Sequence, residues 1–209
     1  VEEHGDGLRV RGRLLTVDGL SLTSEPDTFP KLVAQVTATA YLGAPLLVRQ
    51  RFDPAGFVTD VDKHGAAHAF VVPTMMIDLH RHLTENPELT AEGFEVLGYG
   101  GAQISWSLVT ELQQRLGCDF YQGLGATEAG GYATLLTPAD HRELTRQPSE
   151  SPLASVGRAA AYADVAIIDD TGAEVPTGDL GELRIRSASN FSGYWSQPEL
   201  TRETLVDGW

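Results

Sequence analysis

Short apolar runs alternate with longer amphipathic segments through most of the chain. Short apolar runs bounded by turn residues are typical of buried strands, and longer segments between capping residues are typical of helices. The predicted strands are 45–48, 69–72, 94–99 and 119–121, and the predicted helices are 31–42, 53–64, 73–83 and 105–116. Because strand and helix follow one another in turn, the pattern predicts an α/β fold with a parallel sheet and crossover helices.

Several of these elements carry their own boundary signals. Asp53 is a favourable N-cap and Pro54 suits the first turn, so a helix is expected to begin there. Gly65 and Gly117 are expected to end two helices, because glycine readily takes the left-handed conformation of a helix end. Residues 8–14 alternate apolar and polar positions, which is typical of a half-buried strand.

The pattern changes after about residue 137. Residues 138–152 are polar and contain prolines, which predicts a surface segment or linker. Beyond them, 164–168 and 181–186 are predicted strands joined by turns, with no helix between them. We therefore expect an α/β lobe over residues 1–150 and a small β-rich subdomain over residues 151–209.

The composition is that of a globular protein without a surface for nucleic acid. Hydrophobic residues make up 42% of the 209 positions, which suffices for a core. The formal net charge of −14 argues against nucleic acid and anionic membranes as partners. A nucleotide remains a candidate ligand, since backbone amides and a metal ion can hold it. No run of 18 apolar residues occurs, so no membrane span is expected.

Cys118 is the only cysteine, so no internal disulfide can form. The start of the chain is polar and acidic, unlike a signal peptide. Both features favour a cytoplasmic setting. Cys118 lies at the start of a predicted strand, where a buried structural thiol is expected rather than a nucleophile.

The most informative chemistry lies in residues 121–131, Tyr-Gln-Gly-Leu-Gly-Ala-Thr-Glu-Ala-Gly-Gly, which are expected to form the loop that leaves the strand at 119–121. Glycines allow a backbone to approach a ligand closely. A threonine hydroxyl can bond a phosphate oxygen, and a glutamate can hold Mg²⁺ on that phosphate. Open α/β sheets bind their ligands at such strand ends, so this loop is the candidate site.

Other classes of site have weaker support. The segment Gly98–Gly101 begins like a dinucleotide fingerprint, but position 103 is Gln and the third glycine is missing. His80 and His82 have a spacing on a helix that does not let them share a metal ion. The sequence has neither a Gly-x-Ser-x-Gly elbow nor a Walker A motif. Residues 177–179, Thr-Gly-Asp, are expected to form a plain turn.

The segment at 121–131 resembles the phosphate and nucleotide loop of the AMP-forming acyl-CoA synthetases, adenylation domains and luciferases. Other motifs of that family occur in the family's order: Val72-Pro73-Thr74-Met75-Met76, Gly100-Gly101-Ala102-Gln103-Ile104-Ser105, Ser155-Val156-Gly157-Arg158, 169–176, 181–185, 191–201 and 207–209. The resemblance covers roughly residues 43–209. It implies part of the large N-terminal domain of the adenylate-forming fold, a partial α/β lobe followed by a small β-rich subdomain.

The resemblance also implies a chemistry, in which a small carboxylic acid is adenylated by ATP with Mg²⁺ and then transferred to coenzyme A. The implied catalytic pair is Thr127, bonding a phosphate, and Glu128, holding the metal. The implied nucleotide-binding residues are Gly100, Gly101, Ala102, Tyr121, Gln122, Gly123, Leu124, Gly125, Ala126 and Thr127. The implied acyl-pocket residues are Val72, Thr74, Gly100 and Gly125. The alternative interpretation of Thr127-Glu128 is a helix N-cap followed by an exposed acid.

The chain departs from the family pattern at several points. Leu124 stands where the family usually has an aromatic residue that stacks on adenine, so stacking is expected to be weaker or to come from Tyr121 or Tyr99. Residues 1–42 match poorly, and residues 19–23 lack the histidine that the family commonly has there. The family's phosphate loop, ribose-binding Asp and C-terminal lid are expected in flanking segments of a parent protein. A fragment of a ligase, inactive alone, is therefore expected.

Four functions remain open at this point. The leading one is an acyl-CoA synthetase for a fatty or aromatic acid. The others are an amino-acid adenylation domain of a peptide synthetase, a non-catalytic nucleotide-binding module derived from the family, and an unrelated doubly wound binding protein. The sequence leaves the particular acid, the choice between coenzyme A and a carrier protein, and the oligomeric state open.

Overall fold

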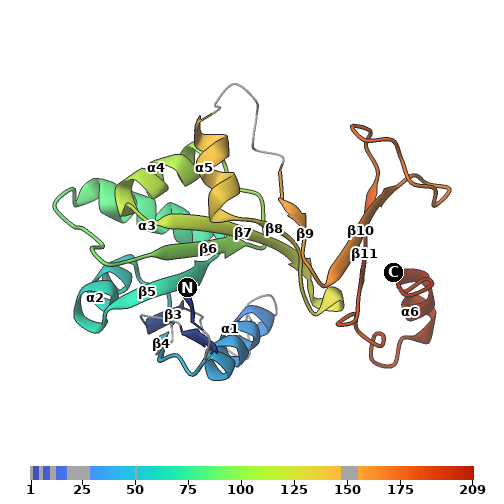
Figure 1. The fold of residues 1–209 in the computed structure, drawn as a ribbon, viewed down its shortest axis with the longest axis horizontal. Coiled ribbons are helices and arrows are strands. Elements are labelled where there is room, and N and C mark those ends of the chain that lie inside the picture. The colour runs from blue at the N-terminus through green and yellow to red at the C-terminus, as the bar shows by residue number, and fades with distance from the viewer. Residues whose placement is uncertain (1, 5–6, 10–12, 18–28, 50, 147–154) are drawn as a thin grey trace. The chain divides into compact units, whose positions relative to one another are not determined.

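The computed structural model describes residues 2–4, 7–9, 13–17, 29–49, 51–146 and 155–209 (Figure 1). Two compact units make up the chain. The first consists of Val1–Gln122 and Thr137–Ser155, and the second of Gly123–Leu136 and Val156–Trp209. The predicted boundary at residue 150 lies outside the described residues and stays a prediction.

The first unit is built on a parallel sheet, as predicted. The strand order is β4-β3-β5-β6-β7 (Figure 1). The strands are β3 (Arg13–Val17), β4 (Leu46–Arg49), β5 (Ala66–Val71), β6 (Val96–Gly100) and β7 (Asp119–Ala126). The pairs β3–β4, β3–β5 and β5–β6 are all parallel. The connecting helices are α1 (Phe29–Leu42), α2 (Pro54–His64), α3 (Pro73–Glu85) and α4 (Trp106–Leu116).

The core of this unit lies between the helices α2, α3 and α4 and the central strands. Each of these helices contributes a stripe of buried apolar residues, and Phe120 contributes from β7. The fully buried members include Phe57, Met76, Leu79, Leu97, Val109, Leu112 and Phe120. Burial of such side chains drives folding of the lobe and leaves the strand ends for polar chemistry.

The predicted helix ends are confirmed by their capping geometry. The Asp53 carboxylate accepts a hydrogen bond from the Gly56 N–H at 2.9 Å and begins α2. Ser105 caps α4 by accepting from the Leu108 N–H. Gly117 ends α4 with φ at 65°, a left-handed conformation that glycine adopts without strain.

The second unit is antiparallel. Strand β8 (Gly131–Leu136) pairs with β9 (Arg158–Ala159), and β10 (Ala163–Ile168) pairs with β11 (Glu182–Ser187). A single 3₁₀ turn, η1 (Thr127–Ala129), follows β7, and a short helix, α6 (Pro198–Thr204), lies near the end of the chain. This confirms a small β sheet after the α/β lobe. The chain passes from the first unit to the second within β7.

Two local predictions need correction. The expected surface segment or linker at 138–152 contains a helix, α5 (Pro138–Arg146). The cause of α5 is a reciprocal cap, in which Thr137 Oγ1 donates to Asp140 and accepts from its N–H. The strand expected at 8–14 is split: β2 (Gly7–Arg9) pairs with β1 (Glu2–His4), whereas β3 belongs to the parallel sheet, and residues 10–12 lie outside the described set.

Cys118 is a buried thiol, as the sequence predicted. Burial, together with the nearby Asp119 carboxylate, raises the pKa of Cys118 to about 12. Because only the thiolate reacts with disulfide reagents, Cys118 is expected to react very slowly with dithionitrobenzoate at pH 8. Full reactivity is expected after urea unfolding. Rapid labelling of the folded chain would contradict a structural role.

Candidate functional site

The first unit gathers several predicted site residues at the carboxyl ends of adjacent strands. Val72 directly follows β5 and caps α3, and Gly100 is the last residue of β6. The parallel register pairs Val71 with Tyr99, so these two strand ends lie side by side. Gly100 is buried, whereas the neighbouring Gly101, Ala102 and Thr74 are exposed. The predicted acyl-pocket residues of this unit thus share one sheet edge, the usual place for a ligand.

The two tyrosines considered for adenine stacking lie in different environments. Tyr121 packs across Gly98, where an added Cβ would approach the ring to 2.3 Å. Tyr99 is 1% exposed, and its hydroxyl hydrogen-bonds to Nε2 of His141 at 3.0 Å. Burial raises the pKa of Tyr99 and lowers that of His141. Tyr99 is therefore a core residue, and the expectation that it stacks on adenine is wrong.

The predicted loop at 121–131 is mostly strand. β7 continues through Gln122 and Leu124 to Ala126, and only the short turn 127–130 separates it from β8. The glycines allow this close packing: a Cβ at Gly123 would lie 2.4 Å from the Tyr132 ring, and a Cβ at Gly125 would lie 2.1 Å from the Gly131 carbonyl oxygen. These two glycines are thus required by the packing of the second unit itself.

Thr127 and Glu128 lie next to each other on the turn η1. The residue that caps the turn is Ala126, without a side-chain hydrogen bond, so the alternative interpretation of Thr127 as an N-cap is wrong. The Thr127 side chain is exposed. Glu128 is half-buried, and its Oε1 accepts a hydrogen bond from the Tyr194 hydroxyl at 2.7 Å. An open hydroxyl beside an oriented carboxylate is suited to a phosphate and its metal ion.

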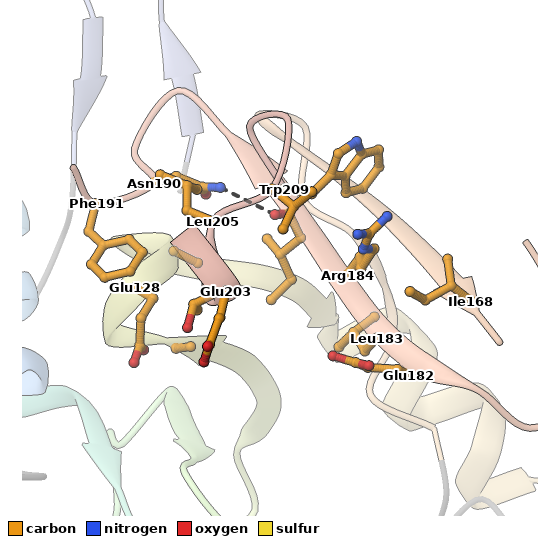
Figure 2. A pocket seen from close by; sticks show the side chains of 15 residues that line it. Glu128, Ile168, Glu182, Leu183, Arg184, Asn190, Phe191, Glu203, Leu205 and Trp209 are labelled. Carbon is orange, nitrogen blue, oxygen red and sulfur yellow. Dashed lines mark hydrogen bonds between the residues drawn. The ribbon is translucent and has the colours of Figure 1, made fainter. Parts of the chain in front are cut away.

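A pocket of about 320 Å³ opens beside this turn within the second unit. In Figure 2, Glu128, Phe191 and Glu203 line its left side, and Arg184 and Trp209 line its right side. This pocket is not predictable from the sequence pattern, because its walls include β11, α6 and the turn, which are far apart along the chain. Phe191 and Trp209 do belong to motifs quoted above, which was the available signal.

The residues fit a magnesium ion only in partnership with a ligand. Among the described residues, no group of three or more histidines, cysteines or acids could hold a metal ion by itself. Magnesium is commonly bound by one or two carboxylates together with substrate phosphates and water. Glu128 supplies one such carboxylate, and the Tyr194 hydroxyl donates a hydrogen bond to its Oε1.

A parallel α/β lobe followed by a small antiparallel sheet, with a Thr-Glu turn after the strand that links them, defines an adenylate-forming N-terminal domain. Residues 30–195 match the AMP-binding enzyme family, and the chain belongs to that family.

Curated relatives agree with this assignment. The chain is 30% identical over 173 residues to the medium/long-chain-fatty-acid–CoA ligase FadD8 of Mycobacterium tuberculosis, covering 83% of this chain and 29% of that protein. It is 36% identical over 148 residues to the fatty acid–[acyl-carrier-protein] ligase ScoC of Streptomyces coeruleorubidus, covering 69% of this chain and 27% of that protein. The chain therefore spans less than a third of the length of these two relatives.

Solved structures show the same fold. The amide bond synthetase McbA of Marinactinospora thermotolerans superposes with a TM-score of 0.79 at 30% identity, covering 96% of this chain and 37% of McbA. The N-terminal domain of FACL13 from Mycobacterium tuberculosis superposes with a TM-score of 0.77 at 27% identity, covering 97% of this chain and 47% of that chain. The relatives thus include ligases with different acyl acceptors.

Proposed function

We propose that this chain supplies the phosphate- and metal-binding turn of an AMP-forming ligase that activates a carboxylic acid with ATP. The observation that carries the proposal is the pair Thr127–Glu128 on one turn, with an exposed hydroxyl beside a carboxylate oriented by Tyr194, in a chain of the AMP-binding enzyme family. In this role Thr127 donates a hydrogen bond to a phosphate oxygen.

In the proposed reaction, a carboxylate oxygen of the acid attacks the α-phosphorus of ATP, and pyrophosphate leaves. A thiol then attacks the acyl carbon of the adenylate, the thioester forms, and AMP leaves. In the transition state of the first step, negative charge accumulates on the oxygens around the α-phosphorus. Hydrogen-bond donors and cations positioned at these oxygens therefore contribute most of the catalysis. The chemistry that Mg²⁺ supplies when bound by Glu128 is neutralisation of this phosphate charge.

We also propose roles for the remaining predicted residues. We assign Val72, Thr74, Gly100 and Gly125 to the acyl pocket. The nucleotide is assigned to Gly101, Ala102 and the β7 residues Tyr121, Gln122, Gly123, Leu124 and Ala126. These assignments follow from the family resemblance and stay proposals.

The proposed substrate is a fatty or aromatic acid, and the proposed acceptor is coenzyme A. Relatives at similar identity include a feruloyl-CoA synthase of an Amycolatopsis species, besides the fatty-acid ligases. A cytoplasmic location, where ATP and coenzyme A are both supplied, stays a prediction. Within the described residues, none of the helices has the length and apolar character needed to cross a membrane.

The 209-residue chain alone is expected to show no acid-dependent ATP–pyrophosphate exchange. It spans 29% of FadD8 and 27% of ScoC, and the resemblance assigns the phosphate loop, the ribose-binding Asp and the lid to other segments. The measurement compares this chain with the complete product of its open reading frame, over a panel of acids. Exchange by the 209-residue chain at a rate close to that of the complete product would contradict the proposal.

A further inference from the structure

The turn that carries Thr127 and Glu128 packs against residues 187–194, which run from the last residue of β11 onward in the same unit. The Phe191 N–H donates to the Glu128 carbonyl oxygen at 2.7 Å. The Ser189 hydroxyl donates to the carbonyl oxygen of the next turn residue at 2.9 Å. The backbone position of the turn therefore depends on this segment.

Gly130 brings the two segments into direct contact. Its φ is +66°, and a Cβ at this position would lie 2.3 Å from the Ser189 carbonyl oxygen. The segment is itself anchored, because the Asn190 side-chain amide donates to the carbonyl oxygens of Ile185 and Gly208, each at 3.2 Å. Figure 2 shows Asn190 next to Phe191 at the pocket wall. The support for the turn is thus built from short, specific contacts.

Tyr194 extends this support to the Glu128 side chain. Its hydroxyl donates to Glu128 Oε1 at 2.7 Å across 66 positions of sequence. The tyrosine is fixed on two further sides: its ring meets the Phe191 ring edge-on, with centroids 4.8 Å apart, and its N–H donates to Thr201 Oγ1 at 2.9 Å. A donor held in this way restricts the rotation of the carboxylate that accepts from it.

The hydrogen bond from the Tyr194 hydroxyl to Glu128 is of the kind that orients metal-binding carboxylates. A hydroxyl bonded to a carboxylate is a charge-assisted contact, and such outer partners orient the oxygens that bind a metal. The Tyr194 bond is made to Oε1, so the role we assign to the metal falls on Oε2.

We propose that Tyr194 is a positioning residue that orients the Glu128 carboxylate for the magnesium ion of Mg²⁺·ATP. It touches neither substrate nor phosphate, and it acts through Glu128. This inference rests on the proposed function of Glu128, which a separate variant tests.

The experiment uses the complete product of the open reading frame and the variant Tyr194→Phe, which removes the hydroxyl and keeps the ring against Phe191. Mn²⁺·ATP affinity is measured by electron paramagnetic resonance, and the Mg²⁺ dependence of pyrophosphate exchange is measured in parallel. We expect roughly tenfold weaker Mn²⁺·ATP binding and a similar rise in the Mg²⁺ concentration for half-maximal exchange. The exchange rate at saturating Mg²⁺ is expected to stay within about twofold of wild type, because the ligand itself is present.

Two comparisons make the result specific. Tyr41→Phe, a control at a side chain that is 89% exposed on α1, is expected to leave both measurements unchanged. In a Glu128→Ala background, Tyr194→Phe is expected to have no further effect on Mn²⁺·ATP binding, because Tyr194 acts through that carboxylate. Thermal unfolding is followed for every variant, so that each comparison is made between folded proteins.

Each outcome decides between the two proposals. Wild-type affinity in Tyr194→Phe, an additive loss in the double variant, or a rate that saturating Mg²⁺ does not restore would overturn the positioning role, even where Glu128→Ala is severely impaired. Wild-type binding and exchange in Glu128→Ala would overturn the proposed function of Glu128, and the inference with it.

Discussion

Replacing Glu128 with alanine in the complete protein is expected to lower acid-dependent ATP–pyrophosphate exchange by about 10²–10³-fold. Phosphoryl chemistry of this kind depends on neutralising charge at the phosphorus, and removal of one well-placed electrostatic group typically costs about that much. Glu128 is the metal-binding candidate because it lies beside Thr127 and is held by Tyr194. The loss should appear in the exchange rate at saturating ATP, and added Mg²⁺ should not restore it.

Glu203→Ala is the matched control for this variant. Glu203 is an acid of the same pocket, carried by α6, and its side chain is exposed. Its removal changes the charge of the pocket by the same amount but leaves the turn intact, so exchange is expected to stay within about twofold of wild type. An equal loss in both variants would show that general pocket charge, rather than the Glu128 ligand, controls the reaction.

Gly125→Ala is expected to disrupt the β7–β8 part of the second unit. The new Cβ would lie 2.1 Å from the Gly131 carbonyl oxygen, a backbone atom that cannot move without displacing its strand. Overpacking of this kind costs about 3 kcal/mol. Hydrogen exchange of the amides in residues 123–136 of the complete protein is therefore expected to accelerate by about 10²-fold, with a loss of adenylation.

The facing position supplies the control. The three atoms nearest to a Cβ at Gly131 would all belong to the Tyr162 side chain, and the closest, its hydroxyl at 3.2 Å, is the far end of that flexible side chain. Gly131→Ala is therefore expected to change amide exchange in residues 123–136 by less than about fivefold. Equal amide hydrogen exchange rates in residues 123–136 of the two alanine variants would contradict this explanation. They would show that the close approach to the Gly131 carbonyl oxygen is not the reason why position 125 requires glycine.

Local chemistry accounts for the parts of the fold that the sequence predicted well. The helix α2 begins at Asp53 and ends at Gly65 as expected, and α4 begins at Ser105 and ends at Gly117. These ends were predictable because each cap is a contact between residues close in sequence. The alternation of apolar strands and helices likewise gave the parallel sheet, since adjacent elements bury one another's apolar faces.

The failures have physical causes of their own. The segment of α5 was predicted to be a polar linker because the side chain it buries is His141, and a histidine does not register as a core residue in a hydropathy pattern. The start of the helix also depends on the hydrogen bond between Thr137 and Asp140. The glycines at 123 and 125 suggested a loop, but they serve close packing inside a strand. The alternation of apolar and polar residues shows neither the burial of His141 nor the close packing around Gly123 and Gly125.

The candidate site was predictable in part. Thr127 and Glu128 were predicted as site residues because they are adjacent and belong to an ordered set of motifs, and their roles stay a prediction. The contact from Tyr194 to Glu128 was not found, because it joins residues 66 positions apart and depends on how residues 187–194 fold against the turn. Tyr194 lies in a quoted motif, yet a motif alone does not state which group a hydroxyl bonds.

Acid-dependent ATP–pyrophosphate exchange by the complete product of the open reading frame, over aliphatic, aromatic and amino acids, tests the central claim most directly. We expect exchange with a fatty or aromatic acid, and we expect that exchange to be lost in Glu128→Ala. A preference for amino acids would contradict the proposed substrate class and favour a peptide-synthetase adenylation domain. An absence of both exchange and adenylate binding would contradict the proposed catalysis and favour a non-catalytic module.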